Sequence, residues 1–405
     1  MTKSALTSKE LIFSHPDTAS ILGLGTASPS HAISQSDSAL IAQDLHITQR
    51  WHQALPALYR KTGVRTRGSV LLAEETNSDT PRQSFYEVSS HSKPFGPTTS
   101  ERMQIYAKEA PPLLFRACHA AISQSQINPA SITHLLTVSC TGFSAPGSDL
   151  ELIKKLKLNN NVQRTNIGFM GCHGAINAIR VGKAIVESDA AATVLLGAVE
   201  LCSIHQQYTE NPQQLVANAL FADGAAAMII GSKIDDELAS NFSADSTSDH
   251  SWTIESTFSQ VIPETSALMS WNIGDYGFQM SLDPQVPACI ESRLHAALSS
   301  WLESQGSSIG AIDGWAIHPG GPRIVQASGA SLGLTQDQIN PSLEVLANHG
   351  NMSSPTILFI LDQLAHSNPN AKQVVLLAFG PGLCIEACLL SANLSAVRPF
   401  FVNGD

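Results

Sequence analysis

The sequence predicts an α/β protein built from two similar halves, in which buried strands alternate with helices. Short continuous apolar runs at 192–197 and 373–378 have the length of buried strands, and each follows a longer segment with helical spacing. The chain also repeats itself faintly, with an offset of about 180 residues. Strand and helix in this order, with continuous apolar strands, imply largely parallel and buried sheets.

The repeat places matching elements in the two halves. Ile132–Cys140 resembles Ile312–His318, and a turn with Pro-Gly or Gly-Gly follows each of them. A helix is expected to open at Cys172 in the first half and at Asn351 in the second. If the two halves face each other, the starts of these helices meet.

The boundary between the halves is expected in Asp235–His250, a segment rich in Ser, Asp and Thr. The N-terminal half would then comprise residues 1–245 and the C-terminal half residues 246–405. A chain of 405 residues is long enough to bury a large core, so the halves can form one intertwined unit.

Cys172 is the first candidate for a functional residue. Glycines stand before and after it in Gly171-Cys172-His173-Gly174, and they permit a sharp turn and the close approach of another molecule. A thiol at a helix N-terminus lies at the positive end of the helix dipole, which favours the thiolate. The alternative is a small buried hydrophobic residue, since free cysteines are among the most buried residues.

His318 and Asn351 stand at similar junctions between regular elements and tight loops. His318 ends an apolar strand and precedes Pro319-Gly320-Gly321, and Asn351 follows Gly350 in a turn before a helix. A distant Cys, His and Asn are a known pattern for a nucleophilic thiol. Taken singly, a core histidine and a helix cap explain the last two equally well.

Composition excludes several classes of protein. Hydrophobic residues make up 43% of the chain and charged residues 14%, and the net charge of −11 argues against a nucleic-acid partner. The longest apolar run is too short to cross a bilayer, and no signal peptide is evident. Seven scattered cysteines without a CxxC pair fit reduced thiols rather than disulfides or a zinc site. We therefore expect a cytoplasmic protein that is not integral to a membrane.

Five motifs resemble those of the type III polyketide synthases, the chalcone-synthase-like condensing enzymes. They occur in that family's order over roughly residues 130 to 390. The motifs are Gly171-Cys172, Leu220–Ala226, Ile317–Pro322, Gly350–Ser354 and Phe379–Gly382. The resemblance implies a thiolase-like fold of α-β-α-β-α layers, a homodimer, and acyl-CoA and malonyl-CoA as substrates. It implies neither a metal nor a further cofactor.

The resemblance also implies roles for single residues. Cys172 would hold the acyl starter as a thioester, while His318 and Asn351 would donate to the thioester oxygen and stabilise the enolate left by malonyl decarboxylation. Phe221 and Phe278 would form gates between the coenzyme tunnel and the reaction cavity. The loop of Gly380, Pro381 and Gly382 would border the substrate.

A local basic stretch is expected to receive coenzyme A. Arg60, Lys61, Arg65 and Arg67 stand close together in a chain that is otherwise acidic, and cations of this kind bind phosphate. By resemblance, Arg60, Lys61 and Arg65 meet the phosphates, and Gly320 lies along the pantetheine arm. The alternative is a solvated basic turn.

Three departures from the plant pattern bear on the starter. Cys202 and His205 stand where flavonoid-forming members carry threonines, and Ala145 replaces a methionine that reaches the partner subunit's cavity. These residues resemble those of bacterial synthases that extend long fatty acyl starters to alkylpyrones or alkylresorcinols. We therefore expect an apolar tunnel for an alkyl chain that begins near Cys202.

Two other enzyme classes and a non-catalytic acyl-binding module share parts of this pattern. A ketoacyl-ACP synthase III shares the fold and the Cys-His-Asn set, but its histidine is normally followed by Gln-Ala-Asn instead of Pro-Gly-Gly. A thiolase needs a second reactive cysteine before a Gly-x-Gly motif, whereas Cys384 follows Gly382. A catalytically silent acyl-binding module remains open, although Cys, His and Asn are all retained.

Overall fold

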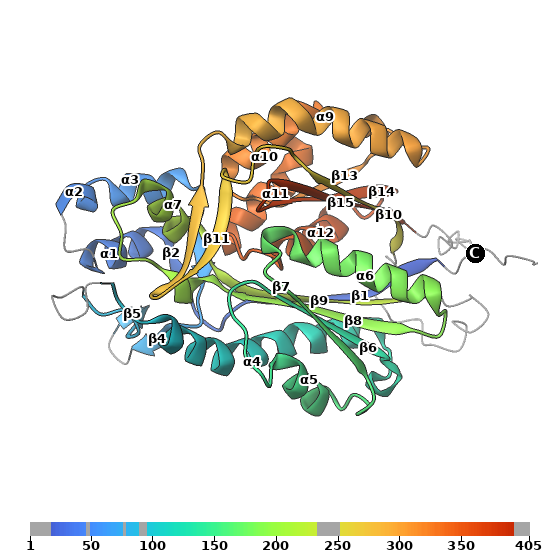
Figure 1. The fold of residues 1–405 in the computed structure, drawn as a ribbon, viewed down its shortest axis with the longest axis horizontal. Coiled ribbons are helices and arrows are strands. Elements are labelled where there is room, and N and C mark those ends of the chain that lie inside the picture. The colour runs from blue at the N-terminus through green and yellow to red at the C-terminus, as the bar shows by residue number, and fades with distance from the viewer. Residues whose placement is uncertain (1–17, 46–48, 76–77, 89–94, 233–251, 393–405) are drawn as a thin grey trace, which may run out of the picture.

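The computed structural model describes residues 18–45, 49–75, 78–88, 95–232 and 252–392. The described chain forms five layers, in the order helix, sheet, helix, sheet, helix (Figure 1). The layered arrangement expected from the sequence is therefore confirmed. The expected linker Asp235–His250 lies outside the described residues, so the division between residues 245 and 246 stays a prediction.

The strands of both halves belong to one hydrogen-bonded sheet in the described chain, ordered β13-β14-β15-β10-β1-β9-β8-β6-β7. Its halves join where β1 pairs with β10 over only two residue pairs. The strands of this sheet are β1 Ala19–Ala27, β6 His134–Ser139, β7 Gln163–Gly168, β8 Thr193–Leu201, β9 Asp223–Ser232, β10 Trp252–Val261, β13 Gly314–Ile317, β14 Gln373–Gly380 and β15 Cys384–Ala392. Two-stranded sheets are formed by β2 Ala32–Ser34 with β3 Thr66–Gly68, β4 Leu72–Glu75 with β5 Ser78–Gln83, and β11 Met269–Gly274 with β12 Gly277–Leu282.

The two halves repeat one strand pattern. In the first half β6 is parallel to β8, and β9 and β1 follow antiparallel; in the second half β13, β14, β15 and β10 repeat these directions. The sheets are therefore mixed, and the expectation of largely parallel sheets is wrong. The connection from β14 to β15 spans only residues 381–383, which suffices for an antiparallel return but not for a parallel crossover.

Helices cover both outer faces and fill the space between the sheets (Figure 1). On one outer face lie α4 Thr99–Ser125 and α5 Ser148–Leu156, and on the other α9 Val286–Ser304, α10 Pro322–Leu332 and α11 Gln336–His349. Between the sheets lie α6 Gly174–Ser188 and α12 Thr356–Ser367. The other helical elements are α1 Gln35–Leu45, α2 Gln49–His52, α3 Leu55–Lys61 and α7 Pro212–Leu220, with the 3₁₀ turns η1 Pro129–Ser131, η2 Gly171–His173, η3 Cys202–His205 and η4 Ile309–Ala311.

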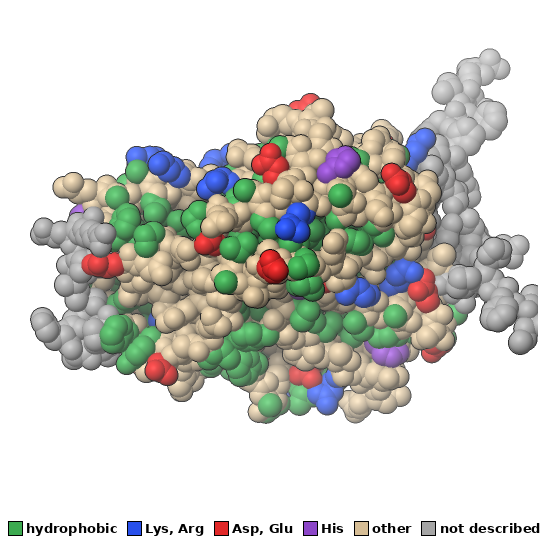
Figure 2. Space-filling view, turned by 45° about the horizontal axis from the view of Figure 1, so that its top comes forward, with side chains coloured by type: hydrophobic (Ala, Val, Ile, Leu, Met, Phe, Trp, Pro, Cys, Tyr) green, Lys and Arg blue, Asp and Glu red, His purple; other side chains and the backbone are tan. Residues whose placement is uncertain are grey.

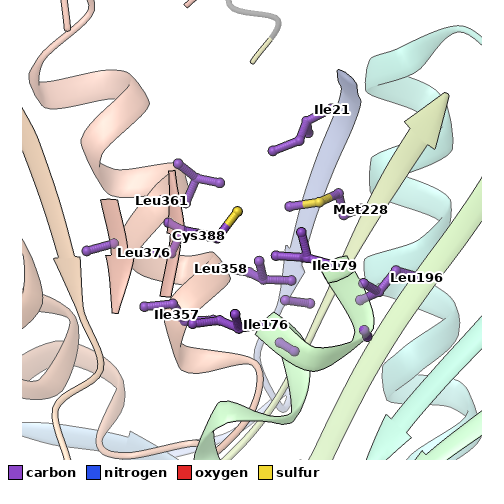
Figure 3. Close-up of a cluster of buried hydrophobic side chains, with 14 of the residues drawn as sticks. Ile21, Ile176, Ile179, Leu196, Met228, Ile357, Leu358, Leu361, Leu376 and Cys388 are labelled. Atoms are coloured by element: carbon purple, nitrogen blue, oxygen red, sulfur yellow. The ribbon is translucent and has the colours of Figure 1, made fainter. Parts of the chain in front are cut away.

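The central core explains the apolar start of α12. Its first six residues, Thr356–Leu361, are all buried, because this part of the helix lies between the two sheets. Ile176 and Ile179 of α6 point toward Ile357 and Leu358 of α12 in the same cluster (Figure 3). Burying each such side chain contributes about 1.5–3 kcal/mol.

The outer helix α4 lies unusually close to β1. A Cβ on Gly25 would stand 2.4 Å from the carbonyl oxygen of Ala117, so only glycine permits this approach. A capping box between Thr98 and Glu101 fixes the start of α4.

The surface is sparsely charged. On the face drawn in Figure 2, Lys, Arg, Asp and Glu side chains stand mostly apart from one another among hydrophobic and uncharged polar groups. Within the described ranges, none of the helices combines the length and the apolar character needed to traverse a bilayer.

Candidate active site

Cys172 lies at the turn that connects β7 to the central helix α6. It occupies η2, directly before the first residue of α6, so the expected strand–cysteine–helix order is confirmed. Gly171 has a φ of +76°, and a Cβ there would stand 2.6 Å from Cδ of Pro381. The sharp turn before the thiol therefore requires glycine.

The Cys172 thiol faces a small enclosed space, here called the inner cavity. Ser353 Oγ donates to Cys172 Sγ at 3.6 Å and also lies 3.4 Å from Cys140 Sγ. The cavity measures about 20 Å³, room for roughly one water molecule. Its walls are Cys140, Thr141, Gly171, Cys172, Cys202, Phe221, Met269, Trp271, Met280, Ser353 and Pro381.

Burial determines the ionisation of Cys172. It raises the pKa of the thiol to about 12, with Ser353 lowering it and the nearby Glu200 raising it further. This rise from 9.0 corresponds to roughly 4 kcal/mol, whereas a helix start stabilises an anion by about 1 kcal/mol. Burial therefore opposes the thiolate that the helix start favours, and the ionisation of the resting Cys172 stays a prediction.

His318 follows the last residue of β13 and lies against the end of β14. Its backbone N–H donates to the carbonyl of Leu377 at 2.8 Å, and its side chain is 1% exposed. Neither ring nitrogen has a hydrogen-bond partner. Burial, aided by His173, lowers the pKa of His318 to about 3, so the ring is neutral at physiological pH.

Asn351 lies in the extended turn before α12. Its backbone N–H donates to Leu220 and its carbonyl accepts from Ala222, each at 2.9 Å, while its side-chain oxygen accepts from the N–H of Ser353 at 2.8 Å. The helix begins at Thr356, so the expected turn before a helix is confirmed. Through this turn Asn351 sets the position of Ser353, the residue that touches the Cys172 sulfur.

A buried carboxylate that the sequence analysis did not single out connects the halves. Glu200, at 0% exposure, accepts from the backbone N–H groups of Cys140 and Thr141 and from the hydroxyl of Ser354. Burial raises its pKa, while the bonds from Ser354 and Thr141 lower it. Ser354 ends one of the five motifs and Glu200 stands two residues before Cys202, but nothing in their spacing revealed the bond between them.

A second space, here called the side cavity, adjoins the inner cavity. Cys202, Phe221 and Trp271 line both of them. The side cavity measures about 80 Å³ and extends to Ile33 of β2 and Leu72 of β4. Cys202 therefore stands where the two narrow cavities adjoin, and the apolar tunnel expected to begin there stays a prediction.

Phe278 lies behind these cavities and is not among the residues that line them. Its ring is fully buried and stacks on His205 with centroids 4.2 Å apart. His205 Nε2 donates to the carbonyl of Thr141 at 2.6 Å and its Nδ1 accepts from the backbone N–H of Phe278 at 3.0 Å. Burial lowers the pKa of His205 to about 3, which keeps this neutral tautomer. His205 therefore holds Phe278 in place.

The expected coenzyme residues are only partly brought together. Lys61 and Gly320 line a larger space of about 510 Å³, here called the outer cavity, with Arg323 as a further cation. Arg60 is exposed and is not among the residues of its wall, and Arg65 donates to the Asn348 side chain at 2.7 Å. Arg323 follows Pro322 in the His318 motif, a position that a search for cations near that motif would have found.

Arg67 points inward instead of toward the outer cavity. Its guanidinium donates to the backbone carbonyls of Asn218 at 2.6 Å and Phe221 at 2.9 Å. It thereby supports the segment in which Leu220 lines the outer cavity and Phe221 lines the inner cavity. Phe221 lines the inner and side cavities but is not among the wall residues of the outer cavity, so its role as a gate stays a prediction.

The remaining expected residues are Ala145 and the segment Gly380-Pro381-Gly382, which begins at the last residue of β14. Pro381 lines the inner cavity, Gly380 packs against the His173 ring, and the Gly382 carbonyl accepts from the Thr265 hydroxyl at 3.2 Å. Ala145 is exposed and lies away from the inner and side cavities of its own subunit. In the described chain, three or more His, Cys, Asp or Glu side chains do not gather into a metal-binding group.

Comparison with known proteins identifies relatives along most of the chain. Residues 12–234 match the family model "Chalcone and stilbene synthases, N-terminal domain", and residues 253–393 match the corresponding C-terminal domain. The α-pyrone synthesis polyketide synthase-like Pks18 of Mycobacterium tuberculosis is 30% identical over 92% of this chain and 91% of its own length. Type III polyketide synthase C of Arabidopsis thaliana is 29% identical over 96% of this chain and 99% of its own.

Solved structures of type III polyketide synthases have a similar fold. PKS-I from the brown alga Ectocarpus siliculosus superimposes with a TM-score of 0.81 and 25% identity over 94% of this chain and 100% of its own. The C-terminal type III polyketide synthase domain of Steely1 from Dictyostelium gives a TM-score of 0.80 at 25% identity over 93% of this chain and 99% of its own. The expected thiolase-like fold is confirmed.

Because His318 is buried in its neutral form, it makes stability depend on pH. Below pH 6.5 the unfolded chain binds a proton that the folded His318 does not bind until about pH 3. Stability therefore falls as pH decreases, by up to about 1.4 kcal/mol per pH unit. We expect His318→Gln to reduce this slope by about that amount between pH 6 and 5, measured by urea unfolding. The exposed His295→Gln is the control, and equal slopes for wild type and His318→Gln would contradict the buried neutral ring.

Proposed function

Because the chain belongs to the chalcone and stilbene synthase family, we propose that it loads a long-chain fatty acyl group from coenzyme A onto Cys172 and extends it with malonyl units to an alkylpyrone. The chain is a type III polyketide synthase, a transferase that joins acyl-CoA and malonyl-CoA by decarboxylative Claisen condensation. The starter, the product and the roles of single residues are the proposed part. The single observation that carries the proposed starter is the side cavity that branches off at Cys202.

In the loading step, a proton must pass from the Cys172 thiol to the His318 ring. The Cys172 thiol gives its proton to neutral His318 as sulfur attacks the acyl carbonyl, and coenzyme A leaves as a thiol after taking up that proton. Malonyl-CoA then loses carbon dioxide, and its enolate attacks the Cys172 thioester. Asn351 and His318 donate to the enolate oxygen, which is electrostatic stabilisation without a metal.

The cavities support the following route for the substrate. The pantetheine arm enters through the outer cavity past Lys61 and Gly320, and its thioester reaches Cys172 beside Phe221. An acyl chain on Cys172 extends past Cys202 into the side cavity. Support for a pyrone product comes from a relative that is named an α-pyrone synthesis polyketide synthase-like protein. Because both inner spaces are narrow, the chain must displace wall residues as it enters.

The proposal also covers the cofactor requirement and the location of the protein. Coenzyme A thioesters are the substrates and no separate cofactor takes part, which suits a site whose chemistry needs only a thiol, an imidazole and an amide. We propose the cytoplasm as its location, because malonyl-CoA and free thiols both belong to a reducing compartment.

A homodimer completes the proposal. β7 is the last strand of the sheet order, and most of its residues are exposed. Beside it lie Phe169, 40% exposed, and Phe143, 57% exposed, with ring centroids 6.3 Å apart. An unpaired edge strand flanked by apolar side chains suits pairing with a second copy about a two-fold axis.

The proposed roles separate in two half-reactions. Cys172→Ala should gain no acyl mass from acyl-CoA, and His318→Ala should lose both loading and malonyl decarboxylation. Asn351→Asp keeps the acceptor for Ser353 but lacks the amide donor, so decarboxylation should fall by about 100-fold while loading falls far less. Intact-protein mass and carbon dioxide release measure the two steps, and the exposed Asn348→Ala is the control. Normal decarboxylation by Asn351→Asp would refute this assignment.

The starter is tested by catalytic efficiency against acyl-CoA length. Each buried methylene contributes about 0.8 kcal/mol, so efficiency should rise about fourfold per methylene until the cavity is full. Cys202→Phe should remove this rise and spare short starters, while Cys202→Ser keeps the volume and serves as the control. Product masses identify the pyrone. A flat profile in the wild type would eliminate the long-chain starter and leave the condensation itself intact.

The homodimer is tested by sedimentation. We expect the wild type to have twice the chain mass of 43.1 kDa. Backbone N–H groups of alternate β7 residues face β6, as those of Gln163 and Phe169 do, so the N–H of Arg164 faces the free edge. Arg164→Pro removes this outward donor and should yield monomer. Arg164→Val keeps the donor and is the control. Sedimentation of the wild type as a monomer would rule out the pairing.

A further inference from the structure

The motif Leu220–Ala226 contains a buried carboxylate that the proposed mechanism does not use. Asp223 is the first residue of β9 and is 1% exposed. It accepts hydrogen bonds from the backbone N–H and the hydroxyl of Ser203, at 2.8 and 2.6 Å, and from the backbone N–H of Val70 at 2.8 Å. These donors are uncharged. Removing a carboxylate from water is costly, so a carboxylate at this position calls for an explanation.

Ser203 connects Asp223 to the turn that carries Cys202. Cys202 and Ser203 are the first two residues of η3. While the N–H and the hydroxyl of Ser203 donate to Asp223, its carbonyl accepts from the Tyr86 hydroxyl at 2.7 Å. Cys202, Ser203 and Tyr86 all line the side cavity. Through Ser203, Asp223 therefore fixes the part of the wall that adjoins the inner cavity.

Val70 connects the same carboxylate to a second part of the wall. It lies between β3 and β4, and its neighbours Ser69 and Leu71 line the side cavity. The Ser69 hydroxyl donates to the Ser203 hydroxyl at 2.7 Å and accepts from the backbone N–H of Leu71 at 3.1 Å. Two stretches that lie far apart in the sequence thus meet at Asp223, and both contribute side chains to one cavity.

We propose that Asp223 is a positioning residue for the acyl starter: it clamps the Cys202 turn to the Ser69–Leu71 segment and so fixes the width of the side cavity. Asp223 is not among the residues that line the inner or the side cavity, so it acts through Ser203 and Val70. A fixed width admits a straight acyl chain and excludes a broader one. The inference rests on the proposed function, because it takes the side cavity as the acyl site.

A carboxylate satisfies these donors, whereas an amide cannot. The Val70 N–H and the Ser203 hydroxyl donate to Oδ2, and the Ser203 N–H donates to Oδ1. Asparagine has one oxygen and one NH₂ group, so in either orientation one backbone N–H loses its acceptor. Burial raises the pKa of Asp223 to about 6, although the bonds from Ser203 and Val70 lower it, so the carboxylate is ionised in an assay at about pH 8. Asp223→Asn therefore loosens the clamp at nearly constant size.

The test measures the efficiency with which each protein loads two starters. Lauroyl-CoA is straight, and ω-phenylnonanoyl-CoA has a similar extended length but a broader end. We expect the wild type to prefer the straight chain, and Asp223→Asn to lower this preference by about 3- to 10-fold, the factor that one net hydrogen bond supplies. The exposed Asp337→Asn on α11 is the control and should keep the wild-type preference.

A double-mutant cycle shows whether the effect runs through Ser203. Ser203→Ala removes the hydroxyl between Ser69 and Asp223 but keeps the backbone N–H, so it should lower the preference by a smaller factor. Because both changes break one link, the double variant should resemble Asp223→Asn alone. Factors that multiply in the double variant contradict the clamp. If Asp223→Asn does not fold, Ser203→Ala decides, and an unchanged preference in it overturns the proposal.

Hydrogen exchange of the full chain separates this inference from the proposed function. In Asp223→Asn, the peptides that contain Val70 and Ser203 should both exchange about 3- to 10-fold faster. Unchanged exchange in either peptide overturns the proposal, as does an equal loss of loading for both starters, which marks a merely structural role. A wild type that loads neither starter, or both equally, refutes the proposed acyl site instead, and the exchange result still decides whether Asp223 holds the two segments.

Discussion

The burial of two helices between two sheets is the constraint on which the rest of this structure depends. The first turns of α6 and α12, Gly174–Ile179 and Thr356–Leu361, are wholly buried, so their side chains pack against one another and against both sheets (Figure 3). Their N-terminal ends then lie beside each other. The thiol that precedes α6 and the turn that precedes α12 meet there, and Ser353 touches the Cys172 sulfur. The same packing that stabilises the fold assembles the site from residues far apart in the chain.

Several buried polar groups at this junction form hydrogen bonds with other protein groups. Glu200 accepts bonds from the end of β6 and from Ser354, and so ties the first half of the chain to the second. Isolated buried carboxylates are costly, which explains why so many donors converge on this one. His205 in turn uses both ring nitrogens to hold Thr141 and Phe278. These bonds fix the position of Thr141, which lines the inner cavity, and of Phe278 behind it.

The electrostatics of the site favour neutral groups at rest. Burial raises the pKa of Cys172 and lowers that of His318, so burial by itself favours the neutral form of each group. The inner cavity beside the thiol has room for about one water. Few waters compete with the donors, which strengthens every hydrogen bond to the reacting oxygen.

The sequence alone determined the family, the two-half α/β architecture and the three residues expected to react, because glycine turns and apolar runs are local features. It could not determine strand direction: the short loop after β14 reverses the chain, and periodicity is the same for either direction. Nor could it place the thiol in apolar surroundings, and so it predicted a thiolate from the helix start alone. The bond from Ser354 to Glu200, the inward turn of Arg67 and the stacking of His205 on Phe278 join residues far apart in the chain. Only the packing of five layers decides such contacts, because it determines which distant side chains share a buried space.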